Sequence, residues 1–174
     1  MALSRRRIIQ GGMLMAAATI ATSSLQSQDQ PQAPPPQPQT KIPDRGPRLD
    51  DDLVRDFVIA GHGNLDKVKE MLAQQPALLN ATWDWGGGDW ETALGGASHM
   101  GNAPIAEYLL SKGARMDVFC ATMLGKTEIV KAFLADDPNV VNLKGPHTIP
   151  LIRHARAGKQ DAIAEMLLAK GAKE

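Results

Sequence analysis

Four segments between residues 64 and 168 share one pattern, in which apolar side chains recur at steps of three and four positions. This spacing places side chains on one face of an α-helix, so each segment predicts an amphipathic helix. Each segment also follows a glycine, at positions 63, 101, 125 and 158. The matched apolar positions are Val68, Met71 and Leu72; Ile105, Tyr108 and Leu109; Ile129, Phe133 and Leu134; and Ile163, Met166 and Leu167.

The stretches before two of these glycines share a second motif. Residues 92–101 read TALGGASHMG and residues 149–158 read IPLIRHARAG. Both resemble the Thr-Pro-Leu-His-x-Ala-Ala-x-x-Gly core of ankyrin repeats, and two helices end in the Lys-Gly-Ala sequence that suits such a repeat. The resemblance implies an all-α ankyrin-repeat solenoid of about four helix-turn-helix repeats, covering residues 47–174.

The irregular spacing of the repeats predicts one enlarged loop. The four glycines are 38, 24 and 33 residues apart, against about 33 in the ankyrin family. The extra residues form the extended Trp/Gly-rich loop before the second repeat, residues 83–90, which read WDWGGGDW. Either these tryptophans anchor a partner, or some of them fold back over the first repeat. We expect Trp90 inside and Trp83 or Trp85 outside.

The resemblance also implies a partner-binding groove, because ankyrin arrays direct the positions just before each repeat's glycine toward their concave face. Methionine adapts to irregular surfaces and arginine binds carboxylates, so a protein ligand suits this row. Met123 could instead pack against the next helix, and Arg156 could be solvated. The candidate partner-binding residues are His62, His99, Met100, Met123 and Arg156 of the groove, and Trp83, Asp84, Trp85, Asp89 and Trp90 of the loop.

The N-terminus predicts export. Arg5 and Arg6 precede a weakly apolar stretch of about 14 residues, too short for a membrane-spanning helix. The pattern resembles a bacterial twin-arginine signal over residues 1–25, with an ordinary secretory signal or an uncleaved anchor as alternatives. Residues 26–46 are rich in Pro and Gln and predict a disordered linker. A periplasmic or secreted protein without a stable membrane span is therefore expected.

The charge balance of the chain argues against one class of partner. The chain has 19 Lys/Arg and 19 Asp/Glu, and three of the arginines lie in the first seven residues, which leaves the remainder with a net charge of −3. This balance argues against nucleic-acid binding. The single Cys120 excludes an internal disulfide and reads as a small core residue. We expect a monomer.

Local motifs for catalysis or metal binding are missing from the sequence. The histidines at 62, 99, 147 and 154 stand singly, and His154 occupies a small-residue position that predicts a structural role. We therefore expect no enzyme, metal or cofactor. The predicted function is a non-enzymatic protein-protein interaction module exported to the bacterial periplasm. The alternative is a small-ligand receptor or enzyme that uses the Trp/Asp loop and His99.

Overall fold

The computed structural model describes residues 45–173, which belong to one compact unit. The predicted export signal, with Arg5 and Arg6, and all but the last two residues of the predicted linker lie outside the described residues. Within the described range the elements are α1 (Asp51–Gly61), α2 (Leu65–Gln74), η1 (Pro76–Asn80), β1 (Thr82–Asp84), β2 (Trp90–Thr92), α3 (Ala93–His99), α4 (Ala103–Ser111), α5 (Val118–Met123), α6 (Thr127–Asp136), η2 (Pro138–Asn142), η3 (Pro146–Thr148), α7 (Leu151–Ala157) and α8 (Asp161–Ala169).

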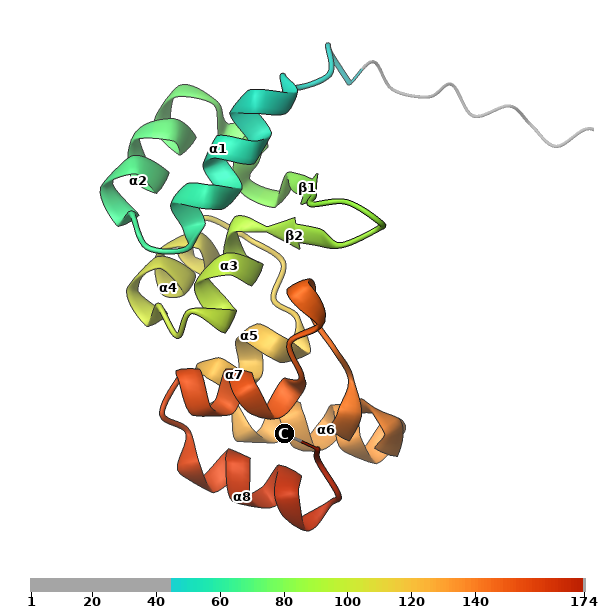
Figure 1. The fold of residues 1–174 in the computed structure, drawn as a ribbon. Coiled ribbons are helices and arrows are strands. Elements are labelled where there is room, and N and C mark those ends of the chain that lie inside the picture. The colour runs from blue at the N-terminus through green and yellow to red at the C-terminus, as the bar shows by residue number, and fades with distance from the viewer. Residues whose placement is uncertain (1–44, 174) are drawn as a thin grey trace, which may run out of the picture. The chain divides into compact units, whose positions relative to one another are not determined.

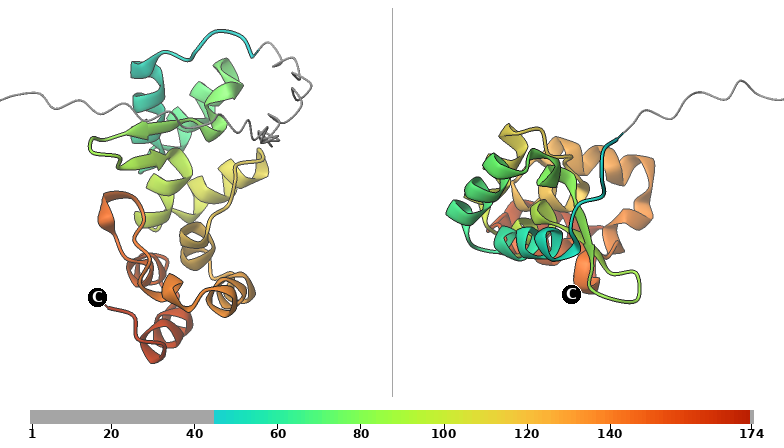
Figure 2. Two further views of the ribbon diagram at one scale, coloured as in Figure 1. Left: turned by 90° about the vertical axis from the view of Figure 1, so that its right-hand side faces the viewer. Right: turned by 90° about the horizontal axis from the view of Figure 1, so that it is seen from above.

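The helices form four antiparallel pairs that stack along one direction (Figure 1). Helices α1, α3, α5 and α7 contact one another in sequence order and make an inner row, and each packs against the helix that follows it. The prediction of a mainly helical fold is confirmed. The hairpin β1–β2 projects from the stack, and the loop that contains η3 lies on the same side (Figure 2).

Side-chain caps fix where several helices begin. Asp50 accepts a hydrogen bond from the backbone N–H of Leu53 at 3.0 Å, and Asp117 accepts one from Cys120 at 2.7 Å. Thr92 caps α3 in the same way, with a 3.0 Å bond from Gly95. These caps satisfy N–H groups that have no partner inside the helix. The start of α3, directly after β2, is therefore defined by the sequence.

The inner helices approach closely where the sequence has glycine. A Cβ at Gly158 would overlap the backbone carbonyl of Met123, and a Cβ at Gly61 would overlap the backbone of Ala93. Each of these contacts joins neighbouring pairs in the stack. Any larger residue there would force the inner helices apart.

The core of the described residues consists of two clusters. The first is formed by α1 to α4 with η1 and part of α5, and it includes the fully buried Phe57 and Leu78. The second is formed by α5 to α8 with η2, and it includes Leu151 and Leu167. Each such side chain contributes about 1.5–3 kcal/mol by its burial. Every helix pair buries apolar surface against its neighbours. The stability of each pair therefore depends on the pairs beside it.

Two sequence predictions about single residues are confirmed. Cys120 is buried, and its burial raises the pKa of the thiol to about 11, which keeps it protonated. His154 is buried in α7, where its Nδ1 lies 3.2 Å from the carbonyl oxygen of Pro150 and its ring packs on Phe119. Across residues 45–173, none of the helices has the length and apolar character required to cross a bilayer.

The buried imidazole of His154 makes the fold sensitive to acid. Burial lowers its pKa to about 4 from an ordinary value of 6.5, so between these pH values the unfolded chain binds a proton that the folded chain excludes. The resulting stability is present above pH 6.5 and is lost as the pH falls toward 4, by on the order of 2–3 kcal/mol. Urea unfolding of wild type and His154→Asn across this range should show their difference shrinking with acid. A difference that stays constant with pH would contradict this assignment.

Candidate metal centre

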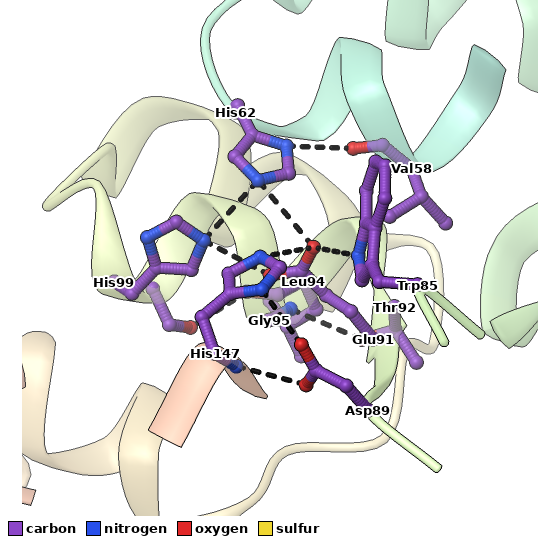
Figure 3. Close-up of polar contacts among 11 residues, drawn as sticks. Val58, His62, Trp85, Asp89, Glu91, Thr92, Leu94, Gly95, His99 and His147 are labelled. Atoms are coloured by element: carbon purple, nitrogen blue, oxygen red, sulfur yellow. Dashed lines mark hydrogen bonds and ion pairs between the residues drawn. The ribbon is translucent and has the colours of Figure 1, made fainter. Parts of the chain in front are cut away.

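The hairpin and the η3 loop meet at the ends of α1 and α3. Four side chains converge there from four different elements: His62 follows the last residue of α1, Glu91 lies in β2, His99 ends α3, and His147 lies in η3. One ligand atom from each can be chosen so that all four lie within 4.8 Å of one another. Figure 3 shows the three imidazole rings around the Glu91 carboxylate.

The strand pairing determines which way Glu91 points. Trp83 of β1 pairs with Glu91 of β2, and Asp84 pairs with Trp90. Because side chains alternate along a strand, Trp90 faces outward with 59% of its surface exposed, whereas Glu91 faces inward and is 1% exposed. The connecting turn requires positive φ angles at three successive residues, Gly86 to Gly88, which only glycine adopts easily.

The Glu91 carboxylate is held by one donor and faced by histidines. Its Oε2 accepts a 2.8 Å hydrogen bond from the indole N–H of Trp85. Its Oε1 lies 2.9 Å from Nε2 of His99, but the two groups are not aligned for a hydrogen bond. No other described residue donates a hydrogen bond to Oε1. Burial favours the neutral acid, but the contacts with His99 and Trp85 and the charge of His62 together lower the pKa of Glu91. The site therefore holds a buried negative charge.

Two of the histidine rings are oriented by acceptors on their outer nitrogens. Nδ1 of His62 lies 3.0 Å from the carbonyl oxygen of Val58, and Nδ1 of His147 lies 2.8 Å from Oδ2 of Asp89. A carbonyl oxygen accepts but cannot donate, so Nδ1 of His62 carries the proton. Asp89 also accepts from the backbone N–H of His147, which lowers its pKa and keeps it an acceptor. A ring whose only proton is on Nδ1 has a lone pair on Nε2 that can bind a metal.

Two of these Nε2 atoms lie near one carboxylate oxygen. Nε2 of His62 and Nε2 of His147 lie 3.4 and 3.3 Å from the same Oε2 of Glu91. Nε2 of His62 also accepts a 3.2 Å hydrogen bond from Nε2 of His99. The acceptors that converge on Oε2 repel one another unless a proton or a metal cation lies between them. Neighbouring ligands of a tetrahedral zinc ion are separated by about 3.3 Å, given bonds of ~2.0–2.1 Å. The three separations given above lie near this value, and the four atoms together lie within 4.8 Å of one another.

The surroundings resemble those of metal ligands in proteins. Histidines that bind metals usually donate their other ring N–H to a carbonyl or carboxylate, as His62 and His147 do here. The rings of His62 and His147 are 26% and 34% exposed, whereas the side chain of His99 is 8% exposed. The cluster is thus closed on the side of Glu91 and open to solvent on the other, which leaves room for a further ligand.

The backbone at η3 is strained. His147 and Thr148 have φ angles of 56° and 58°, in the left-handed region that costs side-chain-bearing residues about 1 kcal/mol each. The loop is held by the two hydrogen bonds from His147 to Asp89 and by a 2.9 Å bond from Gly145 N–H to the carbonyl of Ile149. Such strain persists where the surrounding structure requires it, and here it directs the His147 ring at Glu91.

No family model, curated protein or solved structure matches this chain. The function is therefore inferred from the geometry of the site.

The structure places some of the candidate residues predicted from the sequence at the cluster and others away from it. His62 and His99 lie in the cluster, Asp89 orients His147, and Trp85 holds Glu91. Asp84 instead accepts a bond from the backbone of Gly86 and shapes the turn. Of the others, Met100 is exposed, and Arg156 lines a pocket with His99.

The structure corrects the groove position of Met123 and the buried position of Trp90. Met123 is buried, with 1% of its surface exposed, because it packs into the first core cluster. The alternative of core packing therefore holds for Met123, and it is not available to a partner. Trp90 lies outside, with 59% of its surface exposed, against the expectation that it lies inside. Of the two tryptophans expected outside, Trp85 is 38% exposed and Trp83 packs against the core. The phase of the strand, which buries Glu91, decides this.

Glu91 and His147 are not among the candidate residues predicted from the sequence. Sequence motifs for metal sites consist of short-range spacings, whereas the residues of this cluster are separated by up to 85 positions. One signal was present: His62 and His99 occupy nearly equivalent positions before the glycines of successive repeats, and stacked repeats bring such positions together. No comparable signal marked the other two residues.

The hydrogen-bond pattern makes a prediction about tautomers. In the metal-free chain at neutral pH, His62 should carry its proton on Nδ1, because that atom faces the carbonyl of Val58. Two-dimensional ¹⁵N–¹H correlation spectra of the imidazole rings distinguish the two neutral tautomers. His154, which faces the carbonyl of Pro150 in the same way, serves as the internal reference. Protonation of His62 at Nε2 would remove the argument that its lone pair faces Glu91.

Proposed function

We propose that this protein binds a divalent transition-metal ion through His62, Glu91, His99 and His147. The observation that carries the proposal is the convergence of imidazole Nε2 atoms on a buried carboxylate, two of them with their protons fixed on the far side of the ring. A cation in the middle turns this repulsion into attraction. It also gives the buried charge of Glu91 a partner.

The donor set favours particular metals. Three imidazole nitrogens and one carboxylate oxygen suit zinc, and also iron, nickel and copper, whereas calcium and magnesium prefer oxygen ligands only. Protons compete with the metal for the same lone pairs, so affinity should fall in acid. The open side leaves a coordination position for water or a small ligand. We propose binding and assign no reaction to the site.

We propose the scaffold to be of the ankyrin type. The four stacked helix pairs and the hairpin before α3 support this, together with the repeat motifs of the sequence. In such a stack, the ion would tie the first and second pairs to the loop before the fourth. Metal binding is closer to the alternative function expected from the sequence, a small-ligand receptor that uses the Trp/Asp loop and His99. It is further from the expected module that binds only protein.

Metal titration tests the proposal. The full chain, freed of metal with a chelator, should bind one Co²⁺, used as a coloured probe, and absorption in the visible range should report the ligands. Glu91→Gln keeps the shape of the side chain but removes its charge, and His99→Ala removes a ligand. Each should weaken binding by about 100-fold or more, and Asp89→Asn by about 10–100-fold, since it orients a ligand.

The matched control is His154→Asn, which changes a buried histidine outside the cluster. It should bind Co²⁺ like wild type. Circular dichroism must show that each variant is folded, and Glu91→Gln should retain its fold because it removes a buried charge. Wild-type affinity in Glu91→Gln and His99→Ala would refute the proposal.

Protein binding is a second candidate function, supported by one observation. Trp90 and Met100 are large apolar side chains that are 59% and 58% exposed, and Trp is enriched among residues that dominate binding energy. In this proposal the protein is an exported interaction module of the bacterial periplasm, addressed by the arginines of residues 1–25. The partner would contact the projecting hairpin.

Affinity capture with matched variants tests this second function. Trp90→Ser removes the exposed ring while sparing Trp83, which packs on the core, and Trp85, which holds Glu91. A periplasmic protein captured by wild type should be lost with Trp90→Ser and retained with Phe133→Ser, which changes another exposed aromatic ring on α6. Equal capture by all three would exclude the hairpin as the docking surface.

A further inference from the structure

A pocket of about 350 Å³ adjoins the metal centre. It is lined by His99 and by residues of α7 and the segment that leads into it, which are Ile149, Arg153, Arg156 and Ala157. His99 belongs to both the pocket and the cluster, and Ile149 follows His147 by two residues. The pocket and the candidate metal centre are therefore parts of one region.

Among residues 45–173, the charged side chains that line this pocket are both arginines. Arg153 and Arg156 are three residues apart on α7, a spacing that places them side by side on the helix. No carboxylate is among the described residues that line the pocket. A guanidinium group offers a planar fork of N–H donors that matches a carboxylate or phosphate. The lining thus has the chemistry of an oxyanion site.

The size of the pocket restricts the ligand. Pockets for small molecules measure about 300–1,000 Å³, and this one is near the lower limit. A molecule of a few carbon atoms with a carboxylate or phosphate group fits such a volume. Nucleic acid does not suit the negative charge of the chain beyond its first seven residues.

We propose that this pocket binds a small oxyanion, a carboxylate or a phosphate, next to the metal ion. The proposal rests on the proposed metal-binding function, because the ion supplies a further positive charge at the side of the pocket that His99 lines. The arginines attract the anion from the other side. Metal and anion then strengthen each other's binding by the same factor, as linkage requires.

Calorimetric titration with two probes tests the inference. Succinate and inorganic phosphate are titrated separately into the full chain, once loaded with Co²⁺ and once metal-free. At least one probe should bind with a stoichiometry of one, and about fivefold or more tighter in the loaded chain. The probe that binds tells carboxylate from phosphate, and a change in the Co²⁺ absorption spectrum would show that it reaches the ion.

Matched arginine variants locate the anion. Arg153→Gln should weaken anion binding by about tenfold or more while Co²⁺ affinity stays unchanged, and Arg153→Lys should recover only part of it, because lysine lacks the planar fork. Arg115→Gln, outside the pocket, is the control and should behave like wild type.

The failures of the two proposals are distinguishable. A chain that does not bind Co²⁺ refutes the metal-binding function. A chain that binds Co²⁺ but neither probe overturns the oxyanion site and leaves the metal centre standing. Anion binding that is equal in wild type and Arg153→Gln also overturns the site, since the pocket would then not hold the anion.

Discussion

The buried carboxylate of Glu91 is the constraint on which the rest of the site depends. A carboxylate removed from water costs several kcal/mol unless charge and hydrogen bonds compensate for it. Trp85 supplies one hydrogen bond to it, and nitrogens of three imidazole rings lie 2.9–3.4 Å from its oxygens. The register of the hairpin, the position of the Trp85 indole and the strained backbone of His147 all serve to surround this group.

The helix stack supplies the rigidity that such a cluster requires. The close contacts at Gly61 and Gly158 hold adjacent inner helices at fixed separations, and the Thr92 cap sets where α3 begins. His62 and His99, at the ends of α1 and α3, therefore have fixed positions, whereas His147 comes from a loop. Its two hydrogen bonds to Asp89 fasten that loop to the turn of the hairpin. The proposed metal site is therefore held in place by the fold, without an ion.

The helices could be predicted from the sequence because the signals for them lie within short segments of the chain. The three- and four-residue periodicity marked the outer helices, α2, α4, α6 and α8. Cys120 and His154 could be assigned to the interior because each stands in an apolar or small-residue setting. The mistakes concern strand phase and burial: a three-residue strand is too short to show its phase, so the side on which Trp90 lies could not be read.

The candidate site was beyond reach of the sequence for a different reason. Its four side chains come from separate elements, and only the packing of the pairs brings them together. The most direct test is X-ray absorption spectroscopy of the full chain loaded with one equivalent of Zn²⁺. The account predicts a first shell of nitrogen and oxygen at about 2.0–2.1 Å with the scattering pattern of several imidazole rings. A shell of oxygen alone, without imidazole scattering, would contradict it.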